Sequence, residues 1–229
     1  MSEERRFSFG EILKNLFFPP RCFLCGALLP WDAGTLCPRC RKEADGVLLR
    51  EEKNVFGCSS LYWAADYAGD LRHAMERFKF KGGRTGAEFF GGFLLRLFEE
   101  YKLASLADGI AFIPMPPERL RARGYNQAEV LADFLGKVTG LPVYRNLLLR
   151  RGRSETHRAK DRAERRRITE ESYEAGPGTL PAGTCLLLVD DIVTTGGTMS
   201  AAARLLREKG AADVIGLVPL RTPEETDRP

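Results

Sequence analysis

The 229-residue sequence has no apolar run long enough to cross a membrane and no charged leader followed by apolar and small residues. We therefore expect a cytoplasmic protein that does not insert into a membrane. Internal repeats and low-complexity tracts are also absent, which excludes repeat architectures. A hydrophobic content of 44% and this length suit one α/β domain with a small additional module.

Two common nucleotide-binding motifs are missing as well. The sequence holds neither the Gly-Lys-Ser/Thr of a Walker A loop nor a GxGxxG turn. Instead, an apolar run over residues 185–189 leads into two aspartates, a Thr/Gly loop and a helical segment. Glycines let a backbone approach a phosphate, threonine hydroxyls donate hydrogen bonds, and a helix N-terminus adds oriented N–H groups. The candidate phosphate-binding residues are Thr194, Thr195, Gly196, Gly197 and Thr198.

The two aspartates, Asp190 and Asp191, do not suit a phosphate, because carboxylates only accept hydrogen bonds. They need a partner that donates, such as a vicinal diol or a metal ion with its waters. A ribose 5-phosphate presents hydroxyls on one side and a phosphate on the other, so it fits both halves of the motif. The alternative is a structural helix N-cap with glycines at a tight turn.

The segment from residue 188 to 199 resembles the diphosphoribosyl-binding motif of type I phosphoribosyltransferases. The resemblance implies a ligand, 5-phosphoribosyl-1-pyrophosphate, that binds with Mg²⁺. Asp190 and Asp191 would hold the ribose 2- and 3-hydroxyls, and residues 194–198 would hold the 5-phosphate. Thr194 stands where members that salvage 6-oxopurines carry a general-base aspartate, and this departure argues against that class of substrate.

The order of apolar and polar segments predicts an α/β fold with a parallel sheet. An N-terminal helix is expected to begin at Ser8, to end before Pro19, and to dock an apolar stripe on the rest of the protein. The segment that follows residue 113 is expected to be an Arg-rich loop. Strands are expected over residues 61–67, 109–113, 141–149, 185–189 and 214–220, and helices over residues 70–79, 85–101, 126–139 and 198–209.

Four of the six cysteines form two CxxC pairs, Cys22 with Cys25 and Cys37 with Cys40, separated by eleven residues. Two such pairs can complete a tetrahedral thiolate shell, so we predict a structural zinc site. A filled shell leaves no open position for catalysis. A redox-active CxxC is the competing interpretation.

A four-cysteine module followed by a phosphoribosyl loop resembles the ComF competence-protein family. The shared segments are residues 18–22, 113–116, 123–128 and 189–198. The resemblance implies an N-terminal module over residues 1–58, a phosphoribosyltransferase-type domain over residues 59–229, and a link to DNA uptake. His157 and Ile168 depart from the Gln and Asn that the family usually carries.

Arginines alternate after the strand that ends at residue 113, and in the fold that this sequence resembles that loop faces pyrophosphate. Arg123 and Asn126 are the candidate substrate-binding residues here, because an arginine fork suits a multi-oxygen anion. The alternatives are a solvated loop for the arginines and a helix cap for Asn126, with Glu129 three residues on.

The net charge of +4 is concentrated in one place: residues 150–167 hold nine Lys/Arg and three Asp/Glu. Three interpretations of the basic segment 150–172 stay open. It could be a lid that closes over the ligand, a surface for single-stranded DNA, or a charged exposed loop. Single-strand binders usually interleave aromatic residues, and here the nearest are Tyr144 and Tyr173 at the flanks.

Two functions follow from these patterns. The first is an enzyme that displaces pyrophosphate at C1 of the ribose in favour of an unidentified acceptor, with Mg²⁺ stabilising the leaving group. The second is a non-catalytic component of a DNA-uptake apparatus that senses the ribosyl ligand or binds single-stranded DNA, together with DNA-uptake proteins. Turnover separates the two.

Overall fold

The computed structural model describes residues 9–80, 83–151 and 172–223. Its main sheet has the strand order β1-β2-β8-β6-β3, and the short β7 pairs with the end of β8. The strands are β1 (Arg50–Val55), β2 (Cys58–Asp66), β3 (Gly109–Phe112), β6 (Cys185–Val189), β7 (Ile192–Val193) and β8 (Asp213–Arg221). Every pairing among the described strands of this sheet is parallel except that of β1 with β2. The predicted α/β fold with a parallel sheet is thus confirmed.

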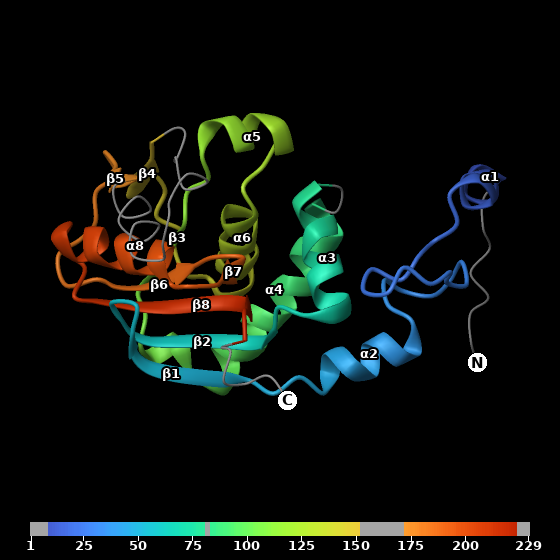
Figure 1. Ribbon diagram of the computed structural model, residues 1–229, viewed down its shortest axis with the longest axis horizontal. Coiled ribbons are helices and arrows are strands. Elements are labelled where there is room, and N and C mark those ends of the chain that lie inside the picture. Colours follow the sequence, from blue (N-terminus) through green and yellow to red (C-terminus); the bar gives the residue numbers. More distant parts are fainter. Residues whose placement is uncertain (1–8, 81–82, 152–171, 224–229) are drawn as a thin grey trace, which may run out of the picture.

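Helices cover both faces of the sheet, which explains why its central strands are continuously apolar. Residues 186–189 of β6 are fully buried, with alternate side chains in two different core clusters. One face packs against α3 (Gly69–Phe80), α4 (Gly83–Glu100) and α6 (Gln127–Thr139), and the other packs against α8 (Gly197–Glu208) (Figure 1). A short 3-10 turn, η1 (Leu103–Ser105), leads from α4 toward β3.

The strand β1 is not expected from the sequence, because its residues are mostly charged and all of them are exposed or half-buried at a sheet edge. It forms because the chain turns back at Phe56 and Gly57, both in the left-handed region, and Arg50 then pairs with Trp63 of β2. The predicted domain boundary between residues 58 and 59 falls at the start of β2, and so it would separate β1 from the strand with which it pairs.

Two expected elements differ in the structure. The Arg-rich loop is a helix, α5 (Pro117–Arg123), which begins with a proline in its first turn and ends at Gly124 with φ of +81°. The expected strand over residues 141–149 reduces to one bridge between Val143 and Ile110 and to β4 (Leu148–Arg150). β4 pairs with β5 (Tyr173–Ala175) in a separate two-stranded sheet, because residues 144–147 carry the chain away from β3.

The N-terminal region contains α1 (Phe9–Phe17) and α2 (Pro38–Asp45), with the cysteine pairs around α2. The expectation that α1 docks on the rest of the protein is wrong. Leu16 and Phe17 are 68% and 70% exposed, and α1 lies apart from the sheet and its helices (Figure 1). Ser8, its expected cap, lies outside the described residues. Among the described helices, none has the length and apolar character needed to span a bilayer.

Candidate functional site

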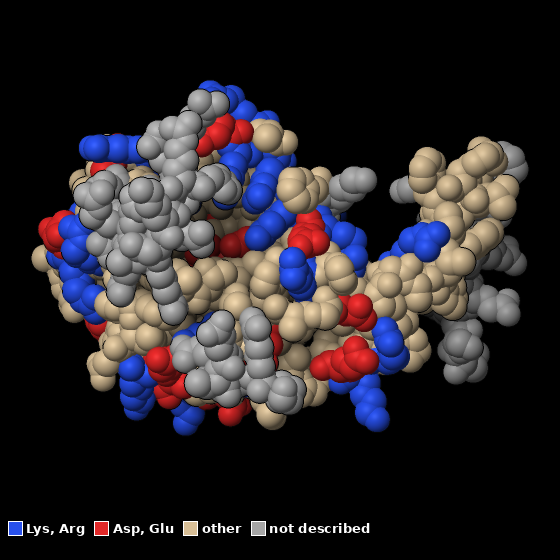
Figure 2. Space-filling model, in the orientation of Figure 1, with Lys and Arg blue, Asp and Glu red and all other residues tan. Residues whose placement is uncertain are grey.

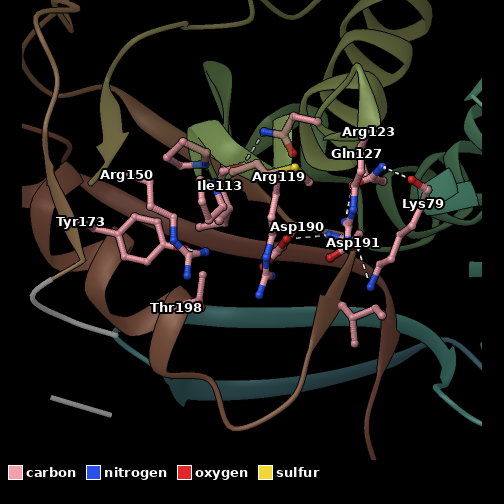
Figure 3. Close-up of a pocket in the computed structure, with 15 residues that line it drawn as sticks. Lys79, Ile113, Arg119, Arg123, Gln127, Arg150, Tyr173, Asp190, Asp191 and Thr198 are labelled. Carbon is pink, nitrogen blue, oxygen red and sulfur yellow. Dashed lines mark hydrogen bonds and ion pairs between the residues drawn. The ribbon is translucent and has the colours of Figure 1, made fainter. Parts of the chain in front are cut away.

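A pocket of ≈ 190 Å³ opens at the carboxyl ends of β3 and β6. In parallel α/β sheets this edge is where ligands bind. Figure 3 shows side chains converging on it from α3, α5, α8 and the paired strands β4 and β5. Its lining residues are Lys79, Ile113, Pro114, Met115, Pro116, Arg119, Arg123, Asn126, Gln127, Arg150, Tyr173, Asp190, Asp191, Ile192 and Thr198.

The two predicted aspartates form the acidic floor of this pocket. The backbone N–H of Asp191 donates to the Asp190 carboxylate at 2.8 Å, and the Asp191 carboxylate pairs with Lys79 Nζ at 3.2 Å. Burial, and the neighbouring Asp191, raise the pKa of Asp190 well above its ordinary value, while Lys79 opposes this shift. The site therefore holds two adjacent carboxyl groups, with Lys79 as a cation beside them.

Cationic side chains surround this acidic floor. Figure 2 shows Lys and Arg gathered over α5 and around the hollow below it, with acidic side chains at the bottom. Arg119 extends into the pocket in Figure 3. Burial and the neighbouring Arg119 lower the pKa of Arg123, as expected where guanidinium groups crowd in a partly buried site. The arrangement suits a ligand that carries hydroxyls and several anionic oxygens.

Sequence reasoning misses three contributors to the pocket. In the sequence, Lys79 is only part of a helix end, and Arg150 and Tyr173 only border the basic segment. Arg150 donates to the Tyr173 hydroxyl at 2.7 Å and lies 4.9 Å from its ring centroid. Burial raises the pKa of Tyr173 to about 12, although Arg150 opposes that shift. Most of the basic segment, including His157 and Ile168, lies outside the described residues.

Asn126 holds the backbone of the pocket together. Its amide donates to the carbonyl of Ile113 at 2.9 Å, and its side-chain oxygen accepts from the Ala128 N–H at 3.2 Å. The residue is 6% exposed and is the N-cap of α6, as the capping interpretation predicted. Because both ends of the amide are used inside the protein, Asn126 fixes the loop after β3 against α6. Its contact with substrate stays a prediction.

The Thr/Gly loop lines a second pocket of ≈ 140 Å³, formed by Asp190 and residues 192–199. The two pockets share Asp190, Ile192 and Thr198, so an anion in the loop would lie next to a diol at the aspartates. Gly196 is the N-cap of α8 with φ of +73°. The predicted order of strand, loop and helix is therefore present, and the binding of an anion there stays a prediction.

Gly196 leads to a stability prediction, because a Cβ added there would overlap the Phe56 ring in the β1–β2 turn. Gly140 is the matched control: its φ of +79° is similar, and nothing lies within 4 Å of its added Cβ. We expect Gly140→Ala to cost about 1–2 kcal/mol through backbone strain. Gly196→Ala should cost about 1–3 kcal/mol more through overpacking. Urea denaturation measures both, and equal losses would contradict the role assigned to Phe56.

The four predicted metal ligands come together in the structure. One Sγ each from Cys22, Cys25, Cys37 and Cys40 lies within 4.8 Å of all the others, and the Cys25–Cys37 distance is 3.8 Å. A tetrahedron with metal–sulfur bonds of ~2.3 Å has edges of about 3.8 Å, so the cluster could hold a metal ion.

The surroundings of this cluster act on its thiols in opposite directions. Burial, and hydrogen bonds with Cys37 and Cys25, raise the pKa of Cys40 above its ordinary value, although a hydrogen bond from Arg39 opposes this shift. Burial raises the pKa of Cys22, but hydrogen bonds from the backbone at Cys25, Cys37 and Leu24 outweigh it and lower the pKa to about 6. Arg39 also approaches the Cys40 Sγ at 3.9 Å. Donors and a cation around four sulfurs are what a negatively charged metal–thiolate centre needs.

Comparison with known proteins agrees with these features. A phosphoribosyl transferase domain family matches residues 153–229. The chain is 27% identical to competence protein ComFC of Bacillus subtilis over 210 residues, covering 83% of this chain and 79% of that protein. It is 32% identical to ComFC of Streptococcus pneumoniae over 193 residues, covering 83% of this chain and 77% of that protein. It is 25% identical to competence protein F of Haemophilus influenzae, covering 86% of this chain and 95% of that protein. At this identity and coverage, with the four-cysteine cluster and the phosphoribosyl loop both in place, the chain belongs to the ComF family of competence proteins.

Proposed function

We propose that this protein binds 5-phosphoribosyl-1-pyrophosphate with Mg²⁺ at the edge of the sheet. The observation that carries the proposal is the convergence of an acidic pair, a Thr/Gly loop at a helix N-terminus and four cations around two adjoining pockets. Few small ligands combine a diol, a phosphomonoester and a pyrophosphate. Each of these groups has a chemically matched partner in the site.

The roles of the residues follow from their chemistry. Asp190 and Asp191 would accept hydrogen bonds from the ribose hydroxyls. Residues 194–198 would bind the 5-phosphate through hydroxyls and N–H groups. The pyrophosphate would lie among the cations that line the same pocket, and Mg²⁺ would sit mainly on pyrophosphate oxygens, because it prefers oxygen ligands and the pocket wall is cationic. These cations are Lys79, Arg119, Arg123 and Arg150.

Two activities are compatible with this site. An enzyme would transfer the ribosyl group to an acceptor and release pyrophosphate, whereas a sensor would bind the ligand without turnover. Thr194 stands at the loop position where a general base would be carried in 6-oxopurine salvage, which argues against a 6-oxopurine as the acceptor. Release of pyrophosphate in the presence of a panel of nucleobases distinguishes the two activities.

The metal proposed for the four-cysteine cluster is structural zinc, since four thiolates leave no open coordination position. The division into two units is part of the same proposal. We assign β1 to the phosphoribosyltransferase-type domain because it pairs with β2, and we assign the residues before it to the metal module.

The biological role that we propose is in the handling of incoming DNA within the cytoplasm. The relatives named competence proteins, and others named DNA utilization protein YhgH at 28% identity, support it. Partners would be other DNA-uptake proteins and, as the alternative to a lid, single-stranded DNA on the basic segment 150–172.

Calorimetry with ribosyl pyrophosphate and Mg²⁺ tests the ligand. Arg119→Gln should weaken binding roughly tenfold, because one charged hydrogen-bond donor to the pyrophosphate is lost. Arg204→Gln on α8 is the control, since Arg204 pairs with Glu208 on the exposed side and lines neither pocket. Wild-type protein that gives no binding signal at millimolar ligand would contradict the proposal.

A further inference from the structure

Helix α3 connects the four-cysteine module with the ligand pocket through two residues of its last turn. Arg77 and Lys79 are two positions apart, so their side chains leave the helix on nearly opposite sides. Arg77 reaches the four-cysteine module, and Lys79 reaches the aspartates of the pocket. The two sites are thus joined by less than one turn of helix.

At the module, the Arg77 guanidinium binds the backbone of the first CxxC pair. Its Nη2 donates to the carbonyls of Phe23 and Leu24 at 2.5 and 2.6 Å, and its Nε donates to Phe23 at 3.2 Å. These two residues lie between Cys22 and Cys25, so the geometry of the metal-binding turn sets where Arg77 is held. Phe23 also packs against Phe90 of α4 at a ring distance of 6.0 Å.

At the pocket, the end of α3 is held by side chains of the ligand-binding half. Helix ends leave carbonyls without helical partners. The carbonyl of Phe78 accepts from the Tyr125 hydroxyl, and that of Lys79 accepts from Gln127 at 3.4 Å. Lys79 Nζ pairs with Asp191 at 3.2 Å, beside the half-buried Asp190. A shift in the last turn of α3 that moved Lys79 away from Asp191 would therefore change the charge balance at the proposed diol site.

We propose that Arg77 is a positioning residue that makes ligand affinity depend on metal in the four-cysteine module. This inference rests on the proposed function. With metal bound, the carbonyls of Phe23 and Leu24 are fixed, Arg77 holds α3, and Lys79 stays at Asp191. Without metal the turn relaxes, α3 loosens at its end, and the aspartate pair loses its counter-ion. Thermodynamic linkage requires the reverse effect: bound ligand must make the metal harder to remove.

The test uses the full chain and the variant Arg77→Gln, which keeps a polar side chain but loses the charged fork. The metal is removed with a chelator, the chelator is then removed and Mg²⁺ is restored, and binding is measured at a temperature where the metal-free chain is still folded. Under these conditions wild-type binding of ribosyl pyrophosphate and Mg²⁺ should weaken roughly three- to tenfold, at the low end of known couplings between sites. Arg77→Gln with metal bound should show the same weakening, and metal removal should then add little. Arg72→Gln is the control, since Arg72 lies on the same helix and pairs with Glu76 in solvent.

A merely structural Arg77 would give a different result. It would lower the thermal stability of Arg77→Gln but leave its affinity and its response to metal removal as in wild type, and that outcome overturns the proposal. Arg77→Lys keeps the charge with a single donor group and should give an intermediate affinity. It also serves as the test variant if Arg77→Gln does not fold.

Hydrogen exchange separates this proposal from the ligand assignment. Metal removal should speed amide exchange in residues 75–80 and 190–193 of wild-type protein, whether or not a ribosyl ligand binds. In Arg77→Gln, exchange there should be fast with metal already bound. If wild type binds no ribosyl ligand but shows this pattern, the ligand assignment fails and the coupling stands. If the rate of amide exchange in both segments is the same with and without metal, the proposed coupling is wrong.

Discussion

Cys25→Ser is expected to remove the bound metal and to destabilise the protein well beyond its N-terminal region. Cys25 Sγ lies 3.8 Å from Cys37 Sγ in the cluster, and a serine hydroxyl does not replace a thiolate ligand. Apparent binding energies of structural zinc in zinc-finger peptides are about 10–16 kcal/mol. That is as large as the whole stability of a typical domain, about 5–15 kcal/mol.

Loss of the metal is expected to affect the α/β domain as well, because the four-cysteine module and the domain share a buried core. The sequence suggests that loss of the metal would unfold a separate module and leave the α/β domain largely folded. In the structure, however, Phe23 and Leu24 belong to the same buried cluster as Phe78 and Phe90 of α3 and α4. Arg96 on α4 also donates to the Ala44 carbonyl of α2 at 2.8 Å. We therefore expect the unfolding transition of the α/β domain to shift as well.

Elemental analysis and thermal denaturation measure this result. Wild type should carry one zinc per chain, and Cys25→Ser should carry almost none. Cys185→Ser is the control, because Cys185 lies at the start of β6, away from the cluster. A Cys25→Ser protein that keeps one zinc and the wild-type melting temperature would refute the metal assignment.

Features that depend only on neighbouring residues in the chain could be predicted from the sequence. The paired CxxC motifs come together because short turns place both cysteines of each pair on one side of a metal. The apolar run of β6, the two aspartates and the Thr/Gly loop occur in consecutive residues, and the structure keeps them in that order. Asn126 caps α6 because the cap depends only on neighbouring backbone.

Features that depend on distant partners were not predictable. β1 has a charged sequence, and it forms a strand because its backbone pairs with β2. Lys79 is far from Asp191 in the sequence, and nothing near it in the chain indicates the ion pair. Besides the shared core, the docking of the four-cysteine module on α3 and α4 uses single arginines that bind backbone carbonyls, and carbonyls leave no pattern in a sequence.

Asp190→Asn is expected to raise stability and lower ligand affinity at the same time. Burial and Asp191 raise the pKa of Asp190 in the folded protein above its ordinary value of 3.8. The folded state therefore binds this proton more tightly than the unfolded state does, and folding is penalised at any pH where the proton is lost. The penalty is present above the raised pKa and disappears as the pH falls toward 3.8. An asparagine carries no charge, so the variant should be more stable near neutral pH by about 1 kcal/mol.

Ligand binding should respond in the opposite direction. The amide keeps one acceptor oxygen but loses the charge that strengthens hydrogen bonds from hydroxyls, so affinity should fall roughly ten- to a hundredfold. Wild-type affinity should also increase as the pH rises through the raised pKa of Asp190, because the ionised form is the better acceptor, while the variant should lack this component.

Denaturation and calorimetry at several pH values measure both effects, with Asp133→Asn as the exposed control on α6. The stability gain should vanish in acid, where wild type and variant converge. An aspartate that served only to cap the helix would give the reverse pattern, with lower stability and unchanged affinity. Lys79 and one backbone N–H offset the burial of the Asp190 carboxylate only in part, so its charge destabilises the folded protein. A charge that destabilises the fold but strengthens ligand binding is typical of a binding site.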